Sequence, residues 1–228
     1  VLLFVLILCW IRGGRENVIF SGKVKNLDSG VVLLYHEDGI TVDTLRLNKK
    51  GEFVYKPLLS DLPGVYIVCV QGTSMFTYIY LRKGCRLHCF FDVTHPEKVP
   101  ILSGDVVAES KIIHIMNEEF VCLDPEMIAQ QSFERYAKGI NDKYNEVILL
   151  LRETHDRKFR QEVLTELNAK RDYNLYCFRA AYKLYVSRET DVQDTAFWNF
   201  AQKLDLNKIE NVKSGLLRMV IAWDFQNE

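Results

Sequence analysis

ITVDTLRLNKKGEFVY, residues 40–55, is the stretch that indicates the fold most directly. Residues 40–47 predict one β-strand and residues 52–55 predict the return strand. Between them lies the loop Asn48-Lys49-Lys50-Gly51, in which Gly51 is free to adopt a positive φ. The stretch therefore predicts a β-hairpin with a short loop.

Similar short strands lie on both sides of this hairpin, with a spacing of roughly ten residues and turns that contain glycine. The further predicted strands are residues 18–24, 31–35, 65–70, 75–81, 86–92 and 99–102. This pattern predicts an antiparallel β-sandwich or open barrel over residues 17–104.

The hydrophobic period becomes helical after Ser103-Gly104-Asp105. Helices are expected over residues 106–120, from Asp124-Pro125, from His155-Asp156, and after Asp191 or Asp194. The expected inner positions are Tyr144, Val147, Ile148 and Leu151 in one helix, Phe159, Val163, Leu167, Phe178, Tyr182 and Tyr185 in the long helix, and Phe197, Phe200, Ala201 and Leu204 in the last. The predicted fold class is α+β, with an all-helical domain over residues 105–228.

Composition excludes two broad classes of protein. The chain has 228 residues, of which 48% are hydrophobic, with 13 Phe and 11 Tyr, so it is not predominantly disordered. It has 29 basic and 30 acidic residues, and this balance argues against non-specific nucleic-acid binding. No nucleic-acid partner is expected.

The first residues, VLLFVLILCWI, are apolar and are followed by Arg12. This run is too short for a membrane span, which needs about 20 residues, but it suits the core of an export signal. Residues 1–16 are therefore expected to be a truncated signal peptide or membrane anchor, with a buried strand as the alternative. Cys9 is a candidate for lipid attachment, and an exported protein of the periplasm or cell envelope is expected.

The C-terminal residues carry an apolar stripe at helical spacing. Its members Leu217, Val220, Ile221 and Phe225 form a candidate face for docking another domain. On this basis the chain is expected to be a fragment of a longer exported protein.

The six cysteines do not form a C-x-x-C motif. Cys85 and Cys89 would lie about 13 Å apart in an extended strand, which is too far for a disulfide. His88 and Cys89 would point to opposite faces of that strand, so Cys85, His88, Cys89 and His95 do not suit a zinc site. Buried free thiols are expected instead.

No other motif indicates a reaction. The carboxylate pairs Glu37-Asp38 and Glu118-Glu119 are interpreted as solvated charges of a turn and a helix surface. The chain contains no G-x-S-x-G, P-loop, dinucleotide-binding or H-E-x-x-H motif. We therefore predict no catalytic residue, no cofactor and no metal ligand.

One pattern of glycine and apolar positions spans the predicted strands. It comprises Phe20-Ser21-Gly22-Lys23-Val24, Gly30-Val31-Val32-Leu33-Leu34, Val42-Asp43-Thr44, Gly51-Glu52-Phe53-Val54-Tyr55, Pro63-Gly64-Val65-Tyr66, Ile79-Tyr80-Leu81 with Gly84, and Ser103-Gly104. It resembles the DUF4369-like β-domain that precedes many exported, TlpA-like thioredoxin-family (AhpC/TSA-type) disulfide oxidoreductases. The helical half, including residues 200–206 and 216–223, resembles the linker domain of those proteins.

The resemblance implies a periplasmic or membrane-anchored protein with a thioredoxin-like domain further along the chain. That domain carries W-C-x-x-C, which is absent here, so no catalytic residue can be transferred. The implied function is that of a non-catalytic N-terminal region that positions or dimerises the redox domain or engages a protein substrate. The alternative is a stand-alone binding or adhesion module of the cell envelope without a redox role.

A third hypothesis is a small-ligand site inside the sandwich at the aromatic strand Phe76-Thr77-Tyr78-Ile79-Tyr80. Core packing is the favoured interpretation of these rings.

Overall fold

The computed structural model describes residues 17–27, 29–36, 39, 41–119, 125–186 and 192–204. Cys9, the expected signal segment and the C-terminal stripe from Leu217 to Phe225 lie outside these residues. The chain divides into two compact units, Val1–His114 and Ile115–Glu228. Strands followed by helices confirm the predicted α+β class.

The described residues of the first unit contain eight strands. They are β1 Ile19–Lys25, β2 Val31–His36, β3 Val42–Arg46, β4 Glu52–Tyr55, β5 Gly64–Val70, β6 Phe76–Leu81, β7 Arg86–Asp92 and β8 Ile101–Gly104. A 3₁₀ turn, η1 (Leu59–Asp61), precedes β5, and a helix, α2 (Val107–His114), follows β8. The β3–β4 hairpin forms as predicted. Gly51 has a φ of 72°, and the Asn48 side chain accepts bonds from the amides of Lys50 and Glu52.

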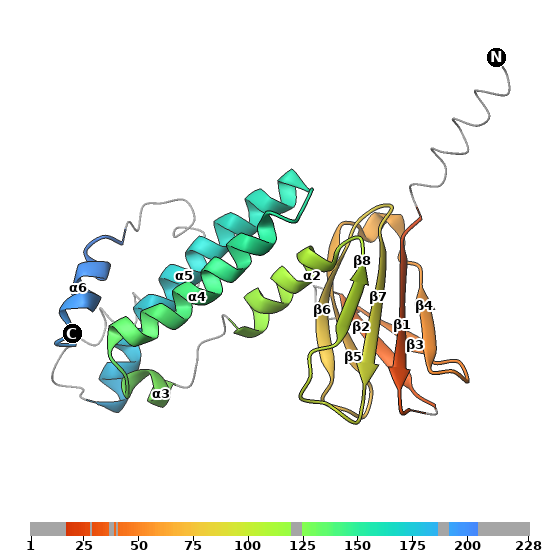
Figure 1. Cartoon of the computed structure of the whole chain (residues 1–228), viewed down its shortest axis with the longest axis horizontal. Coiled ribbons are helices and arrows are strands. Elements are labelled where there is room, and N and C mark those ends of the chain that lie inside the picture. The colour runs from red at the N-terminus through yellow and green to blue at the C-terminus, as the bar shows by residue number, and fades with distance from the viewer. Residues whose placement is uncertain are drawn as a thin grey trace, which may run out of the picture. The chain divides into compact units, whose positions relative to one another are not determined.

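The strands form two four-stranded sheets that face each other (Figure 1). Their orders are β4-β1-β7-β8 and β3-β2-β5-β6. Every pair is antiparallel except β1 and β7, which run parallel from Ile19↔Arg86 to Lys25↔Asp92. The pairing of β1 with β7 is a departure from the antiparallel prediction. On its other side, β1 pairs antiparallel with β4, as predicted for the sheet.

The core of the first unit lies between the sheets. Alternate residues of the strands point inward, as the period of two requires, and most of the inward residues are buried except in β3 and β8, which have no buried residue. The buried inward residues include Phe20, Val24, Val32, Leu34, Phe53, Tyr66, Val68, Ile79, Leu87, Cys89 and Phe91. Each large apolar side chain contributes about 1.5–3 kcal/mol when fully buried.

Helix α2 belongs to the strand-containing unit, which extends to His114. The reason is the buried Ser110. Its hydroxyl accepts a bond from the amide of Tyr80 in edge strand β6 at 3.0 Å, and donates to the carbonyl of Val106 at 2.8 Å. The helix thereby satisfies an edge amide that water would otherwise have to reach.

The second unit is helical in its described residues. Its elements are the π-helical turn η2 Ile115–Glu119, α3 Pro125–Ala129, α4 Phe133–Leu151, α5 Arg157–Tyr185 and α6 Thr195–Ala201. Asp156 and Asp194 cap α5 and α6 as expected. Asp194 also accepts a bond from the Phe133 amide at 3.0 Å, which joins the starts of α4 and α6.

Aromatic rings form the centre of this unit. Phe133 contacts Phe178 and Phe197 edge-on, with centroids 5.3 and 5.4 Å apart. Most predicted inner positions of α5 are buried, including Leu167. Tyr185 is not, because it lies in the last turn of α5 and is 54% exposed.

Candidate functional site

The thiols are the first candidates, and three of the four described ones are buried. None of Cys69, Cys85, Cys89 and Cys177 forms a disulfide, and of these four only Cys69 is half-buried. Burial raises the pKa of the Cys85 and Cys89 thiols. Because the thiolate is the reactive species, these two cysteines are poorly suited to disulfide exchange.

The expected geometry around Cys89 is confirmed. Cys89 points into the core, whereas His88 is on the outer face, where its Nδ1 lies 3.1 Å from the Ser21 hydroxyl. His95 lies in a turn beside Glu97, as predicted. Within the described residues, no group of three or more His, Cys, Asp or Glu side chains could hold a metal ion.

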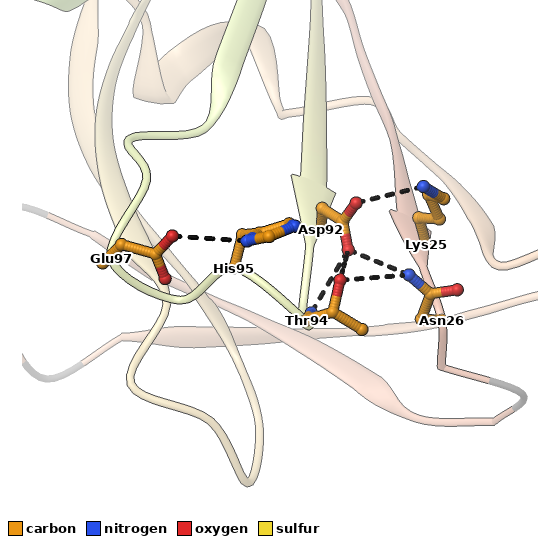
Figure 2. Close-up of polar contacts among 6 residues, drawn as sticks. All are labelled: Lys25, Asn26, Asp92, Thr94, His95 and Glu97. Carbon is orange, nitrogen blue, oxygen red and sulfur yellow. Dashed lines mark hydrogen bonds and ion pairs between the residues drawn. The ribbon is translucent and has the colours of Figure 1, made fainter.

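A polar cluster joins the ends of β1 and β7 (Figure 2). Asp92 accepts bonds from Asn26 at 2.9 Å and from the Thr94 hydroxyl and amide, and it pairs with Lys25 at 3.2 Å. These bonds hold the pKa of Asp92 well below its ordinary value, and the bond from the Thr94 hydroxyl has the largest effect. Since four donors already bind both of its carboxylate oxygens, Asp92 closes a turn and is not a candidate for binding a ligand.

A second polar group lies inside the sandwich, at the end where β2 and β4 finish. His36, Asp43, Tyr55 and Tyr66 occupy inward positions of four strands. Tyr55 donates to Oδ2 of Asp43 at 2.6 Å, and Nε2 of His36 lies 3.0 Å from the same oxygen. The bond from Tyr55 to Asp43 connects the two sheets, because these residues belong to different ones.

A hollow of about 350 Å³ opens beside this group. It is lined by His36, Thr41, Asp61, Pro63, Gly64, Val65 and Tyr66. The ring of Tyr66 meets that of His36 edge-on at 4.8 Å, and its hydroxyl donates to the Asp61 carbonyl at 3.1 Å. The walls are therefore an aromatic pair, a carboxylate and a proline.

Electrostatics in the hollow favour positive charge and hydrogen-bond donors. Burial, and then the charge of Asp61, raise the pKa of Tyr66 to about 12. The Tyr55 hydroxyl, and then His36, hold the pKa of Asp43 below its ordinary value, so the carboxylate stays ionised near neutral pH. Among the described lining residues there is no lysine or arginine to balance Asp61.

The residues alone did not reveal this group, although the signal is visible in hindsight. In a strand with one buried face, a polar residue in the inward register has to be satisfied by a partner. His36 and Asp43 follow this rule. The neighbouring pair Glu37-Asp38, interpreted above as solvated charges, lies outside the described residues.

The rings of the aromatic strand β6 only partly fit the favoured interpretation that they pack in the core. Thr77 and Ile79 point inward, so the rings of Phe76, Tyr78 and Tyr80 lie on the outer face. Tyr80 is buried beside α2, but Phe76 is 36% exposed. Core packing therefore explains only Tyr80.

No family model, curated protein or solved structure matches this chain. None of the described helices is both long enough and apolar enough to span a membrane.

Proposed function

We propose that this chain is the non-catalytic N-terminal region of a thioredoxin-like thiol:disulfide oxidoreductase of the cell envelope, which positions the redox domain or engages its protein substrate. The observation that carries the non-catalytic part is the state of the thiols. Cys85, Cys89 and Cys177 are buried and form no disulfide, and burial raises the pKa of Cys85 and Cys89. Disulfide exchange needs an accessible thiolate, which these residues do not offer.

The layout of the chain supports the scaffold role. A two-sheet sandwich followed by helices agrees with the arrangement that the sequence resemblance implies. The rows of buried residues in both units supply a stable support, and neither unit brings two described cysteines into a bonded pair.

Reduction of insulin by dithiothreitol tests the non-catalytic role. We expect no acceleration of insulin precipitation by this chain, with thioredoxin as the positive control. Cys69→Ser is the matched variant, because Cys69 is the one described thiol that is not buried. Acceleration by the wild-type chain that Cys69→Ser abolishes would show that the chain is itself a redox catalyst.

The source gene tests the redox context separately. A W-C-x-x-C motif within about one hundred codons after Glu228, the length of a typical domain, would support it. A stop codon soon after Glu228 would remove the redox part of the proposal.

The second candidate function is an envelope binding module without a redox role, which the hollow at His36 favours. Its carboxylate, Asp61, and its aromatic walls suit a small ligand with an ammonium group and hydroxyls. Titration with a panel of small amines, followed by NMR shifts of the Thr41 and Gly64 amides, tests it. An absence of shifts at these two amides would overturn this candidate, and shifts that persist unchanged in His36→Ala would show that His36 does not take part in binding.

A further inference from the structure

The outer face of sheet β3-β2-β5-β6 is largely apolar. Thr44 and Arg46 on edge strand β3 are its polar members, and at the other edge the Tyr78 ring meets the His114 ring of α2, with centroids 6.2 Å apart. The strand registers align Val42, Tyr35, Ile67 and Tyr78 in one row, and Thr44, Leu33, Cys69 and Phe76 in the next. All eight side chains are exposed or only half-buried. We define the apolar face as Leu33, Tyr35, Val42, Ile67, Cys69, Phe76 and Tyr78.

The other sheet shows that this is not a general property of the fold. The outer positions of β1 and β7 carry mostly polar residues, Ser21, Lys23, Lys25, Arg86, His88 and Asp92, together with the apolar Ile19 and Phe90. Strands β2 and β5 instead have apolar residues on both faces, which is typical of strands that are covered on both sides. Among the described residues of the first unit, α2 is the one α-helix, and it packs against edge strand β6.

We propose that a second copy of this chain covers the apolar face, in a symmetric dimer in which the two sheets pack back to back. Two-fold symmetry brings the same surface of both copies together, so a charged centre would repel itself. The two aligned rows contain no charged residue, and Arg46 lies outside them at the edge. The centre of the face is thus compatible with its own copy.

The size of the face limits the strength of the dimer. Four strands spaced about 4.8 Å apart, with about five residues each at 3.3 Å, give the whole outer face of the sheet roughly 300 Å² in plan, and the two apolar rows are part of it. Two copies would therefore cover at most roughly 600 Å² in plan, which corresponds to a small, transient interface. The dimer should therefore be a reversible one.

Cys69 is a built-in reporter of this interface. It lies on central strand β5, directly between Leu33 and Phe76 in the register, and its thiol is free. In the dimer the thiol should react slowly with a maleimide, and dissociation should expose it. Cys69→Ser provides the background from the other cysteines.

The test measures oligomeric state by light scattering after gel filtration, from about 1 to about 100 μM, the range of weak to moderate dimers. We expect a concentration-dependent dimer. Ile67→Lys should weaken it by at least about tenfold, because a lysine would be buried without a partner. Phe76→Lys, at a more exposed position, should act in the same direction with less risk to folding.

Val54→Lys is the matched control. Val54 is 63% exposed on the outer face of the other sheet, so this variant should remain dimeric. Circular dichroism checks that each variant is folded.

Three results would overturn the dimer. The wild-type chain could remain a monomer with a fast-reacting Cys69, which would mean that the face is open. It could remain a monomer with a slow Cys69, which would mean that another part of the same chain covers the face. It could dimerise without any effect of Ile67→Lys or Phe76→Lys, which would mean that another surface is used.

The proposed dimer adds an oligomeric state to the scaffold role proposed above, and its biological purpose depends on that role. Oligomeric state has no redox readout, so a monomer would overturn the dimer alone, whereas the insulin assay decides the non-catalytic role.

Discussion

Gly22→Ala should destabilise the sandwich, because the ring of Phe53 occupies the space that a side chain would need. Gly22 faces the core in β1, opposite Phe53 of β4 and beside Cys89 of β7. A Cβ atom at Gly22 would overlap Cζ and Cε1 of Phe53 and lie 2.7 Å from the Cys89 carbonyl oxygen. The ring is only 3% exposed and packs against Phe20, with centroids 5.4 Å apart, so it has little room to move.

The size of the destabilisation by Gly22→Ala depends on how far the Phe53 ring must shift. Normal carbon contacts are about 3.5–4.0 Å, so the Phe53 ring has to move by more than about 1 Å. Overpacking of this kind costs about 1–3 kcal/mol, while the lower entropy of the unfolded alanine chain returns about 0.4–1 kcal/mol. We expect a net loss of about 1–2 kcal/mol in the free energy of unfolding, or roughly 5–15 °C in the Tm of a domain of this size.

Urea unfolding by circular dichroism, together with hydrogen exchange of the β1 and β7 peptides, measures this loss. Gly139→Ala is the control, because nothing lies within 4 Å of its Cβ position in α4, and it should stabilise the helix slightly. In a Phe53→Leu background the cost of Gly22→Ala should shrink. An equal cost in both backgrounds would refute the crowding explanation.

Two further predictions concern hydrogen bonds of single aspartates. The pKa of Asp43 is lowered in the folded state, so its ionisation stabilises the fold above its ordinary pKa of 3.8, and that contribution is lost as the pH falls through the folded value. Asp43→Asn should therefore flatten the acid side of a plot of stability against pH, and an unchanged slope would contradict the role of Tyr55 and His36. Asp194→Ala removes the cap of α6 and the acceptor of the Phe133 amide, and should cost about 2 kcal/mol or more. Circular dichroism in a urea titration would show it, and a loss below that of an ordinary surface substitution would count against the shared cap.

Most of the fold was predictable from local pattern. The strand at residues 86–92 and the return strand at residues 52–55 have the predicted bounds, because alternation and glycine turns are properties of short segments. The same holds for the caps Asp156 and Asp194, whose side chains act on amides two or three residues away.

The features that the sequence did not reveal depend on distant pairs. The parallel pairing of β1 with β7 joins residues 67 positions apart, as in the contact of Ser21 with His88. Likewise, α2 has an ordinary helical pattern, and its packing against β6, including the bond from the Tyr80 amide to Ser110, assigns it to the first unit. The group of His36, Asp43 and Tyr55 required the register of both sheets.

The place of β1 also affects the order in which the sandwich can assemble. Sheet β3-β2-β5-β6 is built mainly from neighbouring strands and can form early, whereas β1 pairs with β4 on one side and with the much later strand β7 on the other. Closing a loop of 67 residues costs about 4 kcal/mol in chain entropy. At about 5–20 residues per second, a ribosome delivers β7 some 3–13 s after β1. During that interval β4 is the one sheet partner available to β1, and the other edge of β1 stays open until β7 arrives.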